Sequence, residues 1–303
     1  MKPPALTSAS STALGDAFIR AFHTEHEREP VFSDVVARHL LTDAEWEGFV
    51  AGVLRSVSNY DESLAGPEAD RIRFWLYSLS AAAPHVLFRS RYTEDRLRDY
   101  VAAGFRQYVC LGAGFDTFAA RRLDWAWETR TVEFDLPATQ ALKIERMRGF
   151  GAASVDYVPI DLASDDLGDG LRAGGLRPDA PVFLNWCGVS YYLSREHIAA
   201  VLAAVRDYFH STVVIVMDYW NERYMTRSAQ DRATRSMFDS VERNNERFVT
   251  GLRTTELSEL ATHLGYRVAE DLGCAEIAER ITAPVVAELV VRPIGRVARL
   301  EIG

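Results

Sequence analysis

Hydrophobic positions recur with two different periods along the chain, and the change falls near residue 100. Before that point they return every three or four residues, which is the period of an amphipathic helix. The segments with this spacing are Ser11–Phe22, Val31–Leu41, a stretch from the capping box Thr42–Glu45 to about Arg55, and a stretch after Pro67. We therefore expect the first hundred residues to be helical. Residues 1–10, rich in Pro, Ser and Ala, are expected to be disordered.

From Arg106 onward, short apolar runs alternate with helical patterns. The runs lie at 107–111, 129–135, 154–158, 181–186, 212–218, 266–271 and 285–299, and the helical patterns at 116–123, 137–149, 194–209 and 254–264. Such alternation is typical of a parallel sheet covered by helices, so we expect an α/β fold with a doubly wound, seven-stranded sheet. The chain should end in an antiparallel hairpin of Val285–Val291 and Arg296–Ile302.

The two patterns predict one compact unit with two parts. Residues 1–88 would form a helical lid that covers the substrate, and residues 89–303 the α/β domain beneath it. The 303 residues are enough for a large core, and α/β folds of this size often form a single domain.

Composition argues against several kinds of partner. The net charge of −9 disfavours nucleic acid, because neutralising phosphates requires a basic surface. We expect no membrane segment, since no apolar run approaches the roughly 20 residues that span a bilayer, and no signal peptide. The three cysteines are too scattered for disulfides or zinc, and the one pair of histidines at metal-ligand spacing, His23 and His26, lacks a third ligand nearby. A cytoplasmic protein without a metal is expected, and no feature indicates its oligomeric state.

Ligands bind such a sheet at the carboxyl ends of its strands, so the residues that follow each strand are candidates for a site. The first strand leads into Gly112-Ala113-Gly114, which is either a ligand-binding turn or only a tight connection. A dinucleotide site would require a third glycine where the chain has Thr117, and Asp116 would repel a pyrophosphate. The turn therefore favours a ligand without phosphate and tells against NAD.

Polar residues also follow the next three strands. Asp135 ends the second strand, where an acidic residue can bind the hydroxyls of a ribose or cap the next helix. Asp161, with Leu162 beside it, could bind the amine of an adenine or only shape a turn. The fourth strand ends in Asn185-Trp186, which are unusual in a buried parallel strand and should face the transferred group. Together these strand ends predict an adenosine site without phosphate.

These strand ends resemble those of the leucine carboxyl methyltransferase family, class I methyltransferases that depend on S-adenosylmethionine (SAM), and in particular its bacterial branch of secondary-metabolite O-methyltransferases. The resemblance covers most of the chain. The residues that carry it are Arg20–His23, Pro30–Asp34, Arg89-Ser90-Arg91, Gly104, Gln107, Leu111–Thr117, Glu133–Pro137, Lys143, Pro159–Leu162 and Gly188–Leu193. It implies a Rossmann-like fold and methyl transfer that leaves S-adenosylhomocysteine.

The resemblance also implies roles for single residues. Arg89 would pair with the methionyl carboxylate of SAM, a task that suits a bidentate guanidinium, and Gly112 would let the backbone approach the cofactor. Asp135 would hold the ribose, while Asp161 and Leu162 would frame the adenine. The other expected cofactor contacts are Ala113, Gly114, Asp116, Leu136, Asn185, Trp186 and Cys187.

One position departs from the family pattern. Many relatives carry a glutamate before the glycine at the fourth strand end, where this chain has Cys187, so that contact with the cofactor is missing or supplied elsewhere. The sequence of residues 185–189 resembles the secondary-metabolite branch of the family more than the branch that modifies proteins. Cys187 itself is expected to be a packed small residue and not a nucleophile.

The acceptor is expected to be a small molecule methylated on oxygen, with a carboxyl group as the leading choice. A carboxylate needs no general base, whereas a phenol or an amine would, and no catalytic residue is assigned. The aromatic residues of the lid form its core or line a pocket, and the candidate substrate contacts are His23, Tyr191, Phe18 and Tyr60. The alternatives are transfer to carbon or nitrogen of an aromatic compound, an NAD-dependent oxidoreductase, and a non-catalytic SAM-binding protein.

Overall fold

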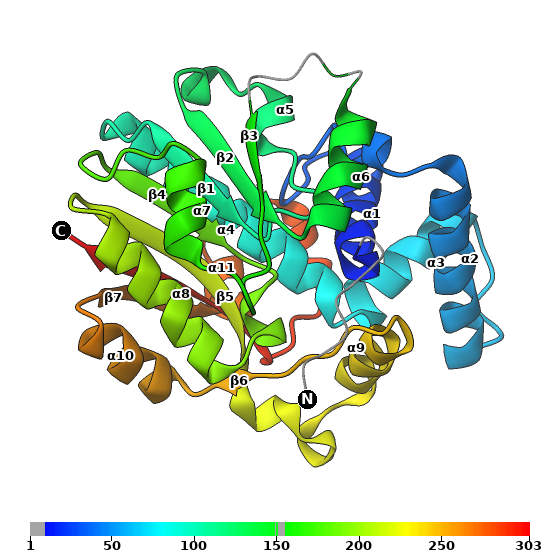
Figure 1. Cartoon of the computed structure of the whole chain (residues 1–303). Coiled ribbons are helices and arrows are strands. Elements are labelled where there is room, and N and C mark those ends of the chain that lie inside the picture. The colour runs from blue at the N-terminus through cyan, green and yellow to red at the C-terminus, as the bar shows by residue number, and fades with distance from the viewer. Residues whose placement is uncertain (1–9, 149, 151–154) are drawn as a thin grey trace.

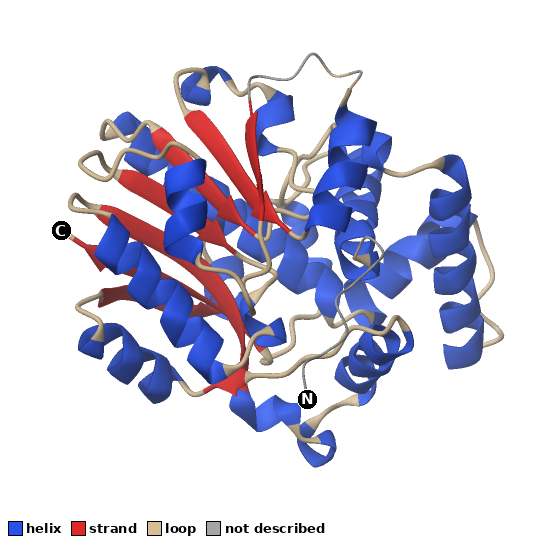
Figure 2. Ribbon diagram, in the orientation of Figure 1, coloured by secondary structure: helices blue, strands red, loops and turns tan. Residues whose placement is uncertain are grey.

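The computed structural model of the protein describes residues 10–148, 150 and 155–303, and it has a central sheet with helices on both faces (Figures 1 and 2). The strand order is β3-β2-β1-β4-β5-β8-β7, and a short eighth strand, β6, pairs with β5. The parallel strands are β1 (Gln107–Leu111), β2 (Arg130–Asp135), β3 (Val155–Pro159), β4 (Val182–Trp186), β5 (Val213–Asn221) and β6 (Gly251–Leu252). The antiparallel strands are β7 (Arg267–Gly273) and β8 (Gly295–Ile302). The predicted Rossmann-like, doubly wound sheet is confirmed.

Each strand contributes to two apolar layers, because successive side chains of a strand point to opposite faces. Tyr108 of β1 lies in one layer and Val109 in the other. The first layer is covered by α4 (Ala82–Ala102), α5 (Phe118–Arg121), α6 (Pro137–Met147) and α11 (Cys274–Ala278). The second is covered by α7 (Leu167–Ala173), α8 (Arg195–Tyr208) and α10 (Thr254–His263).

The N-terminal lid consists of α1 (Ser11–His26), α2 (Asp43–Tyr60) and α3 (Glu68–Phe74), and α2 and α3 stand farthest from the sheet in Figure 1. The predicted capping box is confirmed, since the Thr42 hydroxyl accepts the Glu45 N–H at 3.2 Å and Glu45 accepts the Thr42 N–H at 2.9 Å. The Phe18 ring packs on Trp46 and Phe49 at centroid distances of 4.8 and 5.2 Å. Aromatic contacts thus join α1 to α2.

The predicted boundary between residues 88 and 89 falls inside α4, a continuous helix of 21 residues. Side chains from both halves of α4, such as Leu87 and Leu97, belong to the same apolar layer as α1 and the sheet. The lid and the α/β domain therefore share one helix, and their division remains a prediction.

The predicted C-terminal hairpin is wrong in one of its two strands. Arg296–Ile302 lies in β8, but the segment before it forms a 3-10 turn (η7, Pro284–Glu288). Strand β8 already pairs with β5 on one side and with β7 on the other, so neither edge of β8 is open to Val285–Val291. The antiparallel partner of β8 is β7.

Two predicted helices are shorter than expected. Asp34 accepts the N–H groups of Val36 and Ala37, so only a 3-10 turn forms in Val31–Leu41 (η1, Ala37–Leu40). The segment 116–123 contains only the four-residue α5, because Arg122 adopts a left-handed φ of 47°.

Helix α9 (Arg232–Arg243) was not predicted, and it begins where Asp231 accepts the N–H of Thr234 at 2.8 Å.

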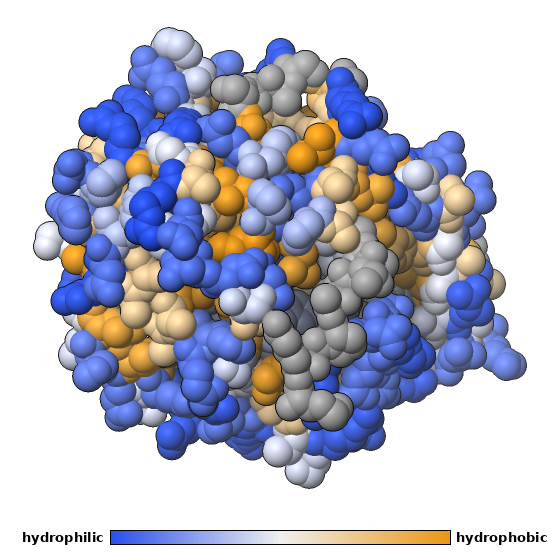
Figure 3. Space-filling model, viewed as in Figure 1, coloured by the Kyte–Doolittle hydropathy of each residue, from blue (hydrophilic) through white to orange (hydrophobic). Residues whose placement is uncertain are grey.

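The expected disorder of residues 1–10 lies outside the described residues, except for Ser10. In Figure 3, hydrophobic side chains gather in the middle of the face, with hydrophilic ones around them. Across the parts of the chain that the structure describes, no helix has the length and apolar character needed to cross a bilayer.

The buried carboxylate of Asp34 links α1 to the segment after β1. It accepts hydrogen bonds from Arg20 Nε at 2.9 Å and from the Thr117 hydroxyl at 2.7 Å. Burial opposes ionisation of Asp34, but the charges of Arg20 and Arg121 and these hydrogen bonds hold its pKa below the usual value. Its contribution to stability is therefore present above pH 3.8 and lost as the pH falls through the lower folded pKa.

Replacing Asp34→Asn should lower the free energy of unfolding at pH 7 by about 3 kcal/mol, because it leaves Arg20 buried without a counter-charge. The difference from the native protein should shrink as the pH falls below 3.8. Urea unfolding at several pH values measures both effects. The control Asp43→Asn, at an 88% exposed side chain, should change stability by less than about 0.5 kcal/mol. Equal losses in the two variants would contradict the role of Asp34.

Candidate functional site

The glycine turn after β1 lies across the carboxyl ends of the neighbouring strands. Gly112 and Gly114 adopt φ values of 69° and 48°, which favour glycine. The N–H groups of Gly112 and Ala113 donate to the Phe134 carbonyl of β2 at 2.8 and 3.0 Å. A Cβ at Gly112 would lie 2.2 Å from Val189 Cγ2, so a side chain is excluded there. The turn thus contacts the ends of both β2 and β4.

Asp135, at the end of β2, points back to this turn. One carboxylate oxygen accepts the N–H of Gly114, and the other accepts the N–H of Leu136 at 2.6 Å. Burial raises the pKa of Asp135, against the effect of these two N–H groups. Leu136 occupies the position before α6, and no side chain caps that helix. The alternative that Asp135 is a helix cap is therefore not supported.

The other strand-end residues show two kinds of surroundings. The half-buried Asp161 accepts the N–H of Ala163 at 2.9 Å, which shapes its own turn, and Leu162 packs on the second apolar layer. Asp116 likewise accepts the N–H of Phe118 at 2.9 Å. These contacts stabilise local turns, and the proposed contacts with a cofactor remain predictions.

Asn185, Trp186 and Cys187 do not point the same way. Asn185 donates to the Tyr108 hydroxyl at 3.0 Å, on the side of the first apolar layer. Trp186 is fully buried in the second layer, and its indole N–H has no hydrogen-bond partner among the described residues. Burial raises the pKa of Cys187 to about 12, so its thiol is not a nucleophile at neutral pH.

Arg89 is the centre of a buried cluster of charged groups. It projects from α4 and its Nη1 donates to Asp218 at 2.6 Å and to the Tyr191 hydroxyl at 2.9 Å. Its Nη2 donates to Asp16 of α1 at 2.5 Å. Three elements that are distant in sequence, α1, α4 and β5, therefore meet at this one guanidinium.

Asp218 holds this cluster in place. It is fully buried near the end of β5 and accepts the Gly188 N–H at 2.7 Å, while its other oxygen lies 2.8 Å from His85 Nε2. Burial opposes its charge, but Arg89 and the bonded groups hold the pKa of Asp218 below the usual value. His85 packs against Gly295, where a Cβ would lie 2.3 Å from its Nδ1. Burial lowers the pKa of His85, so its ring is neutral at pH 7.

Of the four candidate substrate contacts, only Tyr191 lies in this cluster, and its ring stacks on Trp220 at 4.4 Å. His23 is fully buried in the lid, where Nε2 accepts the Val31 N–H at 2.8 Å and Nδ1 lies 2.8 Å from the Tyr77 hydroxyl. Burial lowers the pKa of His23 to about 4. The other two candidates are Phe18, in the lid core, and Tyr60, which is 47% exposed at the end of α2.

Sequence reasoning missed three acidic residues of the site. Asp218 ends the apolar run of β5, so reading strand ends as far as the fifth strand would have found it. Asp16 and Glu246 lie far along the chain from their partners, and no local pattern marks them. Only the tertiary structure brings these two residues to the site.

Glu246, which follows α9, caps the first turn of α1. Its carboxylate accepts the N–H of Ser11 at 2.9 Å and the hydroxyls of Ser10, Ser11 and Thr12. Exposed helix N–H groups and the helix dipole both favour an anion at this end. The same turn of α1 covers the glycine turn, since a Cβ on Gly114 would lie 3.1 Å from Ala13 Cβ.

Comparison with known proteins identifies the family. The profile of the leucine carboxyl methyltransferase family matches residues 13–206. The chain belongs to this family. YktD of Bacillus subtilis strain 168, provisionally named an S-adenosyl-L-methionine-dependent methyltransferase, is 26% identical over 275 residues, 89% of this chain and 90% of the relative. A Frankia alni protein with a similar provisional name is 32% identical over 200 residues, 64% of this chain and 63% of the relative.

A solved structure from Thermobifida fusca YX, provisionally described as a methyltransferase, has a similar fold. It covers 82% of this chain and 93% of its own, with a TM-score of 0.55 and 16% identity. This chain is therefore a methyltransferase of the leucine carboxyl methyltransferase family, and SAM is its cofactor. The alternative of an NAD-dependent oxidoreductase is wrong.

Replacing Glu246→Gln should destabilise the protein by about 1 kcal/mol, because the neutral amide caps the α1 N-terminus less well than the carboxylate. Urea unfolding measures the change, and amide hydrogen exchange at Ser11–Leu14 shows whether the first turn is affected. The matched control is Glu242→Gln on α9, with a half-exposed side chain 3.8 Å from Arg227. Unchanged exchange in the Glu246 variant would show that the cap is not required.

Proposed function

We propose that this methyltransferase transfers a methyl group to oxygen of a small molecule of secondary metabolism, and that the acceptor group is a carboxylate. The observation that carries the choice of acceptor is the state of the two buried histidines, His23 and His85. Both ring nitrogens of each histidine lie within hydrogen-bonding distance of other protein groups, and burial lowers the pKa of each ring. A carboxylate acceptor is already ionised and requires no base.

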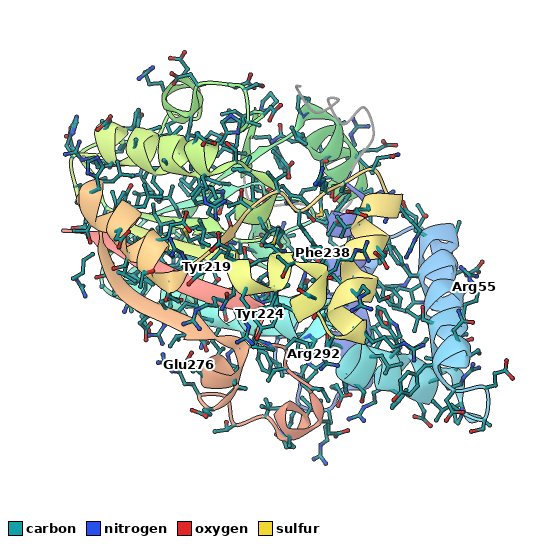
Figure 4. All side chains as sticks on the ribbon, turned by 90° about the horizontal axis from the view of Figure 1, so that it is seen from below. Arg55, Tyr219, Tyr224, Phe238, Glu276 and Arg292 are labelled. Carbon is teal, nitrogen blue, oxygen red and sulfur yellow. The ribbon has the colours of Figure 1, made fainter. Side chains whose placement is uncertain are left out.

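Charge around α9 also supports an acidic acceptor. Phe238 and Val241 of α9 pack with Tyr191, and in Figure 4 Phe238 lies on the part of α9 nearer the sheet. At the start of the same helix, Arg232 lies 5.2 Å from the Tyr60 ring. Neither Arg232 nor the exposed Arg235 is paired with a carboxylate of the described chain. Unpaired cations near the lid would attract an anionic substrate.

The residues present fit the cofactor by their chemistry. Arg89 Nη2 already holds a carboxylate, that of Asp16, so the same nitrogen can hold the methionyl carboxylate of SAM. Asp135 offers carboxylate oxygens for the ribose hydroxyls beside the glycine turn, and Asp161 with Leu162 would hold the adenine. When bound, SAM supplies a methyl group on a positively charged sulfur.

The chain's own part in the reaction is to position the groups and to exclude water. The lid and α9 would cover the acceptor, while the cluster around Arg89 would fix the amino-acid end of the cofactor. The cysteines of the described chain are free, which fits a reducing, cytoplasmic location. Cys187 stands where many relatives have a glutamate, and its Sγ lies 3.6 Å from the hydroxyl oxygen of Thr93.

A second candidate is transfer to carbon or nitrogen of an aromatic compound. The observation that favours it is the aromatic cluster at the ends of β4 and β5, where Tyr191 stacks on Trp220 and meets Phe248 at 5.2 Å. Such a cluster would suit a flat or cationic acceptor. The chemistry of the product distinguishes this candidate from a carboxyl acceptor.

Incubation with SAM carrying a labelled methyl group and a panel of carboxylic acids, phenols and aromatic amines should label the acids. The methyl ester so formed should release its label as volatile methanol in mild base, because esters hydrolyse under conditions that spare ethers and N-methyl groups. Base-stable label would favour the second candidate. Binding of SAM with no turnover of any acceptor class would support a non-catalytic SAM-binding protein.

Replacing Asp135→Asn should weaken SAM binding by about 10- to 100-fold, the loss expected for hydrogen bonds to a charged group. Titration calorimetry measures the dissociation constant. Asp156→Asn on the neighbouring strand β3, where the side chain is 49% exposed and pairs with Arg130, is the matched control and should leave it unchanged. Unchanged binding in the Asp135 variant would contradict the ribose contact.

A further inference from the structure

We propose that Asp16 of α1 is a binding residue for SAM, and that its carboxylate takes the ammonium group of the methionyl part. The inference rests on the proposed pairing of Arg89 with the methionyl carboxylate. It adds a contact from the lid helix, beyond the contacts from the strand ends.

The two carboxylates on Arg89 are held very differently. Asp218 is fully buried and is fixed by Gly188 and His85 as well as by Arg89. The side chain of Asp16 is 19% exposed, and Arg89 is its only hydrogen-bond partner in the described part of the chain. Asp218 is therefore a permanent anchor, whereas Asp16 can exchange its partner.

An amino acid can enter the Arg89–Asp16 pair without leaving a charge uncompensated. The pair holds one positive and one negative group, and so does the methionyl part of SAM. The incoming carboxylate would replace Asp16 on Nη2 of Arg89, and the freed Asp16 would receive the ammonium. Two ion pairs then replace one, so neither protein group stays buried without a partner.

The charge of the cluster favours an added cation. It contains one guanidinium, Arg89, and two carboxylates, while His85 is neutral, so one negative charge is in excess. The nearby Arg20 is engaged by Asp34 at 2.9 Å. Burial raises the pKa of Asp16 against the charges of Arg89 and Arg20, and the neighbouring Asp218 adds to the rise. The amino-acid part of the ligand adds one charge of each sign, so the positively charged sulfur of SAM would supply the missing charge, while the ammonium pairs with Asp16.

The position of Asp16 on α1 agrees with this role. Residues three or four apart share one face of a helix, so Ala13, Asp16 and Arg20 lie in a row. Ala13 touches the position of the Gly114 Cβ, and Arg20 donates to the Phe115 carbonyl at 2.7 Å. Asp16 thus lies between two contacts that hold α1 against the glycine turn.

The test compares the dissociation constants of SAM and of 5′-methylthioadenosine, which lacks the ammonium, the carboxylate and the positive charge on sulfur. Asp16→Asn should weaken SAM binding at least about tenfold and leave 5′-methylthioadenosine binding unchanged. S-Adenosylhomocysteine, which keeps the amino acid on a neutral sulfur, separates these effects, and its binding should be weakened as that of SAM is. The control Asp99→Asn, with a 62% exposed side chain on α4, should change neither constant. Thermal unfolding of the ligand-free variants shows whether each one folds.

Unchanged or tighter SAM binding in the Asp16 variant would overturn the inference, because the carboxylate would then only block Arg89. Equal weakening of both ligands would also overturn it, since the effect would come from the general structure of the site. If Asp16→Asn does not fold, Asp16→Glu, which keeps the charge, should retain the preference for SAM over 5′-methylthioadenosine, and its loss would contradict the proposal. If the native protein binds SAM no more tightly than 5′-methylthioadenosine, the proposed pairing of Arg89 with the methionyl carboxylate is contradicted, whatever the Asp16 variant shows.

Discussion

The buried pair of Arg89 and Asp218 is the interaction on which the rest of the site depends. A buried ion pair is favourable only when every polar atom of both groups is satisfied, because desolvation costs several kcal/mol per ion. Here Gly188, His85, Tyr191 and Asp16 complete the pair. The pair also joins the lid to the sheet, since Arg89 belongs to α4 and Asp218 to β5.

Much of the fold follows from the spacing of apolar residues. The runs that became β1 to β5 were predicted because each is short and largely apolar, and the runs of β1, β2 and β4 are followed by a helical pattern. The error at Val285–Val291 has a different origin, because a valine-rich segment predicts a strand only if a sheet edge is open to it. That edge is taken by β7, whose pairing with β8 no local pattern reveals.

The site was predictable to the extent that it lies at strand ends. Gly112, Asp135 and Asn185 could be named because they lie at or just after the carboxyl ends of apolar runs, at the edge where parallel strands meet. Asp16 and Glu246 could not be named, because their partners are far away in the sequence. Asp16 is 73 residues from Arg89, and Glu246 is 235 residues from Ser11. Such contacts are set by the docking of α1, which depends on the whole lid.

The continuity of α4 has a consequence for engineering. Arg89, the proposed contact for the methionyl carboxylate, lies in a helix of 21 residues, about 30 Å long. A cut at residue 88 would divide this helix one residue before the guanidinium. A chimera that takes the lid of a relative, to change the acceptor, is therefore better joined at Ser80, where the backbone is extended just before α4 begins.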